Sequence, residues 1–129
     1  MKNEIIGFTT DHTFRAPREM QQAIHHLLYS LGISPKYVGF HQLSYALELT
    51  TCEPERLSLV TKWLYPDVAR HFQTSFAVVE RNLRSVVSLS WSLRPDAFPA
   101  LYGIHLEHKP STSDFLSLLT AYLLMDHAA

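Results

Sequence analysis

A chain of 129 residues has the length of one domain. It is 47% hydrophobic and 18% charged, which excludes a disordered chain, and its net charge of −1 does not indicate a polyanion-binding protein. No apolar run has the length of a membrane span, the first residues lack the apolar core of a signal peptide, and a single cysteine, Cys52, suits a reducing compartment. We therefore expect a small cytoplasmic domain with no membrane partner.

Helical periodicity begins at Pro17. The first predicted helix covers residues 17–31, because Pro17 suits a first turn and Gly32 a C-terminal cap. Its apolar positions follow one helical face: Met20, Ile24, Leu27, Leu28 and Leu31. A second helix is predicted to start at Ser34 and Pro35, as N-cap and first-turn proline. Its apolar stripe is narrower: Val38, Leu43, Ala46, Leu47 and Thr50.

A third helix is predicted from about residue 53 to Tyr65, with Leu57, Val60 and Leu64 facing inward. Residues 66–91 then predict two helices separated by a tight turn at residues 73–75. The short first helix carries Val68, Ala69 and Phe72, and the longer second helix carries an inward face of Phe76, Val79, Leu83, Val86 and Trp91.

A short segment at residues 97–102 ends at Gly103, and Ser111 or Thr112 is expected to cap a last helix. That helix is apolar on more than one face, so it either covers a neighbouring loop or offers a surface to a homodimer or another partner. The prediction is an all-α fold of about six helices, with residues 1–16 as an N-terminal extension and residues 17–129 as the domain. We find no internal repeat.

Residues 65–84 have the pattern of a helix-turn-helix, in which Ala69 allows a close helix crossing and Val79 packs the second helix onto the first. Thr74 or Ser75 can cap the second helix. Residues 62–94 carry a net charge of +3, which the neutral total hides. The outward positions expected on the second helix are Ala77, Glu80, Arg81, Arg84, Ser85 and Ser88. The alternative is that Glu80 and Arg84 only form a solvated pair on a helical hairpin.

Two motifs carry a family resemblance. Residues 61–69, Thr-Lys-Trp-Leu-Tyr-Pro-Asp-Val-Ala, and residues 79–84, Val-Glu-Arg-Asn-Leu-Arg, are similar to T-K-x-L-Y-P-D-I-A and V-E-R-x-I-R. Trp91-Ser92 and residues 109–115, which are similar to K-P-x-N-S-E-F, add to the match. Over residues 19–127 the chain thus resembles the C-terminal DNA-binding effector domain of the sporulation initiation response regulators, a six-helix domain with a helix-turn-helix of the winged-helix-like effector class.

The resemblance implies a sequence-specific, double-stranded DNA-binding transcription regulator. Its base-reading candidates are Glu80, Arg81, Arg84 and Ser85, and its phosphate-contact candidates are Lys62, Arg70, His71, Thr74 and Ser75. The chain departs from the family where basic residues are replaced by Val78 and His71, histidine by Ser85, and the turn asparagine by Gln73. Fewer cations predict weaker phosphate binding and a shallower salt dependence.

Residues 1–16 cannot supply the family's phosphorylated receiver domain, so the chain is either a stand-alone protein or an excised effector domain. The alternative function is a protein-binding paralogue that sequesters a related regulator or a polymerase subunit. RNA polymerase sigma subunit and a homodimer on tandem sites are the other candidate partners. We expect no enzyme activity, cofactor or metal site, because no nucleophile, phosphate-loop or four-ligand pattern occurs and Cys52 suits a semi-buried structural thiol.

Overall fold

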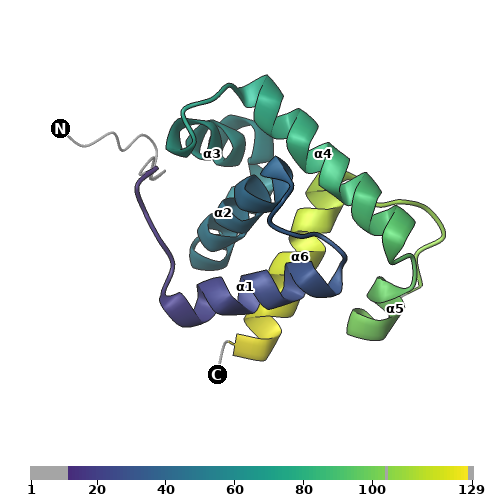
Figure 1. The fold of residues 1–129 in the computed structure, drawn as a ribbon. Coiled ribbons are helices and arrows are strands. Elements are labelled where there is room, and N and C mark those ends of the chain that lie inside the picture. Colours follow the sequence, from purple (N-terminus) through teal and green to yellow (C-terminus); the bar gives the residue numbers. More distant parts are fainter. Residues whose placement is uncertain (1–11, 104, 128–129) are drawn as a thin grey trace.

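The computed structural model describes residues 12–103 and 105–127. This part of the chain is helical and contains no β-strand, which confirms the all-α prediction (Figure 1). The α-helices are α1 (Arg18–Ser30), α2 (Val38–Cys52), α3 (Tyr65–His71), α4 (Phe76–Leu93), α5 (Ala97–Tyr102) and α6 (Thr112–His127). A 3₁₀ turn, η1 (Pro54–Ser58), and a π turn, η2 (Val60–Leu64), connect α2 to α3.

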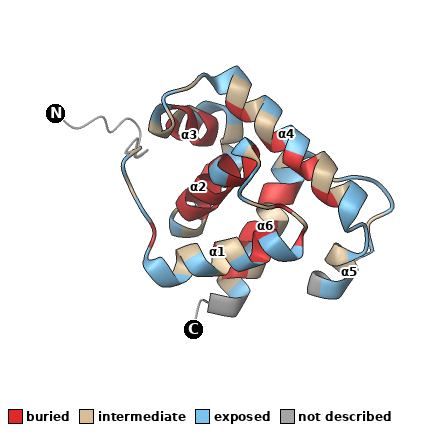
Figure 2. Cartoon of the chain, in the orientation of Figure 1, coloured by how far each residue is buried: buried red, intermediate tan, exposed pale blue. Residues whose placement is uncertain are grey.

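Helix α2 is the centre of the fold, and α1, α3, α4 and α6 all pack against it (Figures 1 and 2). Every residue from position 42 to position 50 is buried, so the prediction of a narrow apolar stripe was wrong. The predicted start was also wrong. Ser34 begins a turn, and its carbonyl accepts a hydrogen bond from the Tyr37 N–H at 3.2 Å. Helix α2 begins only at Val38. Val38 is 62% exposed and does not belong to the core.

The predicted third helix over residues 53–65 was wrong, because η1 and η2 occupy this segment and Leu59, with non-helical φ and ψ of −139° and 53°, separates them. Arg56 explains the break. Its guanidinium is fully buried, forms ion pairs with Asp67 at 2.8 Å and Glu53 at 3.1 Å, and lies over the ring of Trp63. A buried charge must be paired, so the chain here bends around Arg56 and cannot continue as an amphipathic α-helix.

Helix α1 ends as predicted. Gly32 has a φ of 83°, and Ile33 donates a hydrogen bond to the Leu28 carbonyl at 2.9 Å, which closes a Schellman cap. Helices α5 and α6 also have their expected ends, since Gly103 has a φ of 69° and the Ser111 hydroxyl accepts a hydrogen bond from the Asp114 N–H.

Helix α6 runs through the interior beside α2, which explains its wide apolar surface. Phe115, Leu116, Leu119 and Leu123 are all buried, and Leu124 is half-buried. Of the apolar residues that suggested a partner surface, Met125 is 76% exposed. The apolar width of this helix therefore reflects burial on several sides, and Figure 2 shows buried residues on α6.

The described end of the predicted extension, residues 12–16, packs onto α2, while residues 1–11 lie outside the described residues. Arg15 donates two hydrogen bonds of 2.9 Å to the buried carboxylate of Glu48, and the Ala16 N–H donates a third. The Tyr45 hydroxyl donates to the His12 carbonyl at 2.9 Å. These contacts join residues 12–16 to the helical body.

Candidate nucleic-acid interface

Helices α3 and α4 form the helix-turn-helix that the sequence predicts, with residues 72–75 as the turn. Gln73 has a φ of 54°, and the Thr74 N–H donates to the Ala69 carbonyl at 2.9 Å, so α3 ends in the same type of cap as α1. Ser75 caps α4, because its hydroxyl accepts a hydrogen bond from the Val78 N–H at 3.2 Å. The turn therefore requires a left-handed residue at a position where this chain has glutamine.

One face of α4 is fixed against the core. Its buried residues are Val79, Leu83, Val86, Val87 and Ser90. The close crossing with α2 depends on Gly39, where an added Cβ would lie 2.7 Å from the Asn82 carbonyl oxygen and 2.5 Å from Val86. The Asn82 side chain also donates to buried Gln42 at 3.1 Å. These contacts fix the rotation of α4 about its axis.

Two aromatic residues differ from their predicted burial. Phe76 is 38% exposed, because it lies in the first turn of α4 beyond the core, where its ring meets Tyr65 edge-on at 5.6 Å. Trp91 is half-buried and packs against the core. The prediction of Phe76 as a core residue was therefore wrong, and Leu83 is the centre of the buried face.

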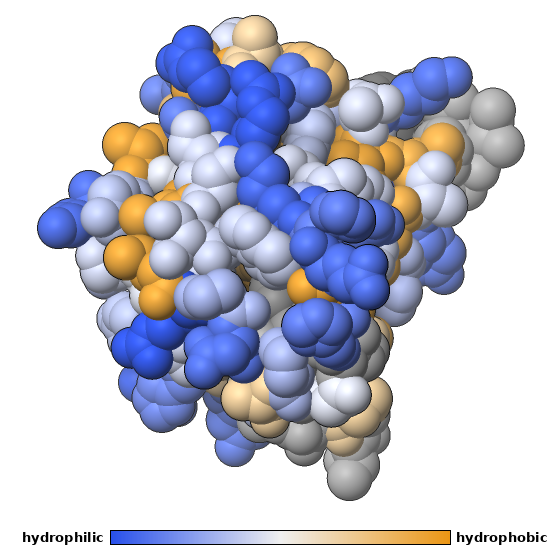
Figure 3. All heavy atoms as spheres, turned by 90° about the vertical axis from the view of Figure 1, so that its right-hand side faces the viewer, coloured by the Kyte–Doolittle hydropathy of each residue, from blue (hydrophilic) through white to orange (hydrophobic). Residues whose placement is uncertain are grey.

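The outer face of α4 carries the base-reading candidates. Ala77, Arg81, Arg84 and Ser85 are exposed, and Glu80 and Ser88 are half-buried. Within the described ranges, no ion pair involves Glu80, Arg81 or Arg84, so the solvated Glu80–Arg84 pair does not form. Figure 3 shows the α4 side of the molecule, where strongly hydrophilic side chains form a band across the surface. Both arginines on this face keep all their donors available for a ligand.

The phosphate-contact candidates divide into two groups. Lys62 on η2 is exposed and has no ion pair in the described part of the chain, and Thr74 and Ser75 lie in the turn. Arg70 forms an ion pair with Asp67, although 47% of its side chain is exposed. Asp67 itself is completely buried between Arg70 and Arg56. The structure thus brings Arg70 into an internal charge network that the sequence did not indicate.

His71 is also held by the protein. Its Nδ1 atom lies 2.7 Å from the His12 carbonyl oxygen, and its ring stacks on Tyr45 with a centroid distance of 3.7 Å. The residues that hold it come from the N-terminal segment and from α2, 59 and 26 positions away in the chain. His71 therefore connects the end of α3 to residues 12–16.

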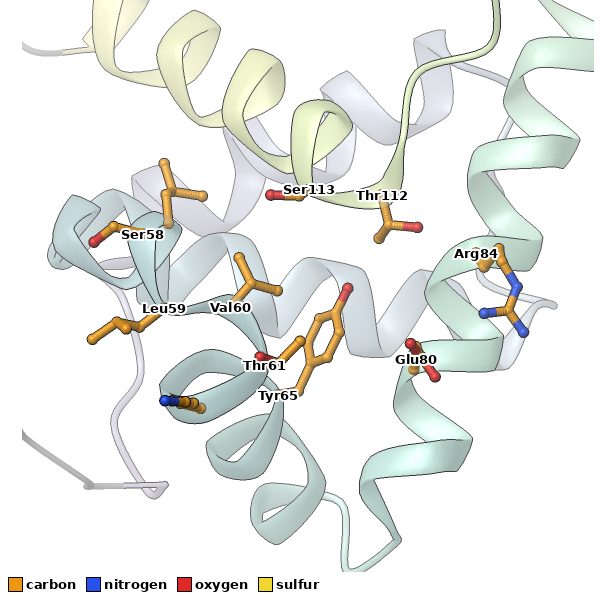
Figure 4. A pocket seen from close by; sticks show the side chains of 11 residues that line it. Ser58, Leu59, Val60, Thr61, Tyr65, Glu80, Arg84, Thr112 and Ser113 are labelled. Atoms are coloured by element: carbon orange, nitrogen blue, oxygen red, sulfur yellow. The ribbon is translucent and has the colours of Figure 1, made fainter.

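A cavity of about 430 Å³ lies beside this face (Figure 4). Its lining comes from η1, η2, α3, α4 and the first turn of α6, and includes Lys62, Tyr65, Glu80, Arg84, Thr112 and Ser113. Burial raises the pKa of Tyr65 to about 12, with a further increase from Glu80 and an opposing effect of Arg84. Tyr65, Thr112 and Ser113 were not among the predicted site residues, although Tyr65 lies in the Leu-Tyr-Pro-Asp motif of residues 64–67.

The fold and this site define a helix-turn-helix domain. A comparison with known families is specific: residues 24–123 match the family described as "Sporulation initiation factor Spo0A C terminal". The chain belongs to this family of helical DNA-binding domains of transcription regulators, which is not a family of known enzymes. No helix in the described part of the chain has both the length and the apolar character that crossing a membrane needs.

Proposed function

We propose that this chain binds double-stranded DNA sequence-specifically, with α4 in the major groove. The observation that carries the proposal is the pair Arg81 and Arg84. Both are exposed and without an ion pair in the described residues, on the side of α4 opposite to fully buried Val79 and Leu83. A helix held on one face and free on the other is the arrangement that helix-turn-helix proteins use for reading base edges.

Each side chain has a role that follows from its donors and acceptors. Arg81 and Arg84 can each bind guanine O6 and N7 with two parallel hydrogen bonds, and Glu80 can accept from cytosine N4. Ser85 can act as donor or acceptor at the next turn of α4. Arg84 also borders the cavity, so it lies at the edge of the face.

The phosphate contacts are assigned by availability. Lys62 is the primary candidate because its ammonium is exposed, and Thr74 and Ser75 contribute from the turn. Arg70 can offer only donors that its pairing with Asp67 leaves free. His71, which is tied to the His12 carbonyl, is assigned to positioning the end of α3.

A fluorescence-anisotropy titration tests the proposal. The labelled duplexes carry the binding element of the sporulation regulator or a scrambled version of it, and each is titrated at two salt concentrations. We expect tighter binding to the element, and weaker binding to both duplexes at the higher salt concentration. Binding to neither duplex at low salt, or equal binding to both, contradicts the proposal. Arg18→Ala is the matched control for alanine variants of the α4 arginines, because Arg18 is an exposed arginine on α1.

This proposal includes no protein partner: neither a homodimer on tandem sites, nor the sigma subunit of RNA polymerase, nor a regulator that the chain would sequester. The apolar surface of the last helix suggested a partner, but Leu116 is completely buried and Leu124 is half-buried. The feature that favoured a protein partner is thus explained by packing within the domain.

A further inference from the structure

The cavity beside α4 is lined by a tyrosine whose hydroxyl makes no hydrogen bond to the described residues. Tyr65 is only 3% exposed, and its hydroxyl has no hydrogen-bond partner among the described residues. Figure 4 shows the hydroxyl pointing across the cavity toward Thr112 at the start of α6. A tyrosine hydroxyl that lines a cavity can donate a hydrogen bond to a polar ligand there. The Tyr65 hydroxyl is therefore available to a ligand that enters the cavity.

The opposite wall of the cavity is the N-terminus of α6, a helix of 16 residues. The Ser111 hydroxyl takes the N–H of Asp114, and the N–H groups of Thr112 and Ser113 have no acceptor in the part of the chain that the structure describes. The side chains of Thr112 and Ser113 line the cavity as well. Free N–H groups and the helix dipole together favour an anion at this position.

The charges around the cavity agree with an anionic ligand. Lys62 and Arg84 line it, and their two positive charges exceed the single negative charge of Glu80. Burial raises the pKa of Tyr65 to about 12, so its hydroxyl stays protonated at neutral pH and can donate. Arg84 belongs both to the cavity lining and to the exposed face of α4, so an anion here lies next to a DNA strand bound at that face.

We propose that this cavity binds one backbone phosphate of the bound DNA, with the Tyr65 hydroxyl and the first turn of α6 as donors. The inference rests on the proposed function and adds the first turn of α6, which lies outside the helix-turn-helix, to the DNA contacts. It assigns a DNA-binding role to Tyr65, Thr112 and Ser113. The contact carries no base information, because phosphates are the same in every sequence.

The first test is Tyr65→Phe, which removes only the hydroxyl and keeps the ring contact with Phe76. We expect the melting temperature to stay the same, because the substitution removes no hydrogen bond to the described residues. Affinity for element and scrambled duplexes should fall alike, by about tenfold, the size expected for a lost hydrogen bond to a charged group. Tyr29→Phe, at an exposed tyrosine on α1, is the control and should change neither quantity. A lower melting temperature with unchanged affinity would show a structural role and overturn the proposal.

The second test locates the phosphate. Duplexes with a single neutral methylphosphonate at each backbone position are titrated with the wild-type protein, Tyr65→Phe and Thr112→Val. We expect one position at which the neutral linkage weakens wild-type binding clearly but has little further effect on either variant. Equal losses for wild type and variants at every position overturn this inference and leave the proposed function intact. A wild-type protein that binds no duplex at all overturns the proposed function itself.

Discussion

At the end of α3, Arg70 pairs with Asp67 of the same helix and His71 contacts the His12 carbonyl, whereas Arg81 and Arg84 on α4 are exposed and without an ion pair among the residues described. All four lie in the basic stretch of the sequence, where Arg81 and Arg84 were predicted to read bases and Arg70 and His71 to contact phosphates. Asp67 neutralises Arg70, and the His12 carbonyl and the Tyr45 ring fix His71. The comparison teaches that a basic residue counts as a DNA contact only after its internal partners are known.

The largest expected effect is on stability, through the ion pairs of Asp67 with Arg56 and Arg70. Asp67→Ala removes the 2.8 Å ion-pair partner of Arg56, whose side chain is 1% exposed, and so weakens the pairing of a buried charge. We expect the free energy of unfolding to fall by about 3–5 kcal/mol, as for other broken buried ion pairs. Urea unfolding followed by circular dichroism measures it. Asp96→Ala, at an exposed aspartate, is the control, and a loss as small for Asp67 as for Asp96 would mean that the network is not structural.

Leu83→Ala tests the buried side of α4 directly. Leu83 is completely buried, so the substitution leaves a cavity and should cost about 2–5 kcal/mol. Leu93→Ala is the control on the same helix, because Leu93 is 54% exposed, and it should cost much less. DNA binding should be lost only at temperatures where the variant unfolds. An unchanged melting temperature together with abolished binding would place Leu83 on the DNA face, and the assignment of Arg81 and Arg84 would fail with it.

The sequence was sufficient for the parts of the fold that are amphipathic. The ends of α1, α5 and α6 and the helix-turn-helix follow from caps, glycines and periodic apolar residues. Periodicity could not identify α2 as the central helix, because a helix buried on most sides loses its amphipathic pattern and here includes polar Gln42 and Glu48.

The features that the sequence did not predict depend on contacts between residues far apart in the chain. Arg56 looks like a surface residue in the sequence, and its pairing with Asp67 eleven positions later breaks the predicted third helix. The fixed state of His71 depends on His12, 59 positions earlier. For the site, the outward face of α4 followed from spacing, while the cavity with Tyr65 required the packing of α6 against the region of η1 and α4.

The salt dependence of DNA binding compares Lys62, which has no ion pair in the described part of the chain, with Arg70, which pairs with Asp67. Lys62→Ala should weaken binding to every duplex and reduce the slope of log K against log salt by about one, because a free phosphate contact is lost. Arg70→Ala should change the slope by less, since its charge is already compensated by Asp67. Titrations at four or five salt concentrations give both slopes. A larger change for Arg70 than for Lys62 would reverse the comparison.

The smallest expected effect is on stability, at the turn between α3 and α4. Gln73 has a φ of 54°, a backbone region that glycine adopts without a Cβ penalty, so Gln73→Gly should raise the free energy of unfolding by up to about 1 kcal/mol. Gln22→Gly, at an exposed position inside α1, is the matched control and should lower stability, because glycine is a poor helix residue. Destabilisation by Gln73→Gly would mean that the glutamine side chain has a role in the turn.

The central claim is that the free arginines of α4 read the DNA sequence. Its most direct test is the affinity of Arg81→Ala and Arg84→Ala for the regulator's binding element and for scrambled duplex. We predict a loss of roughly 1–3 kcal/mol on the element for each variant and a smaller loss on scrambled DNA, so that the preference for the element declines. If both variants keep the wild-type preference and affinity, another surface of the protein reads the DNA and the account is contradicted.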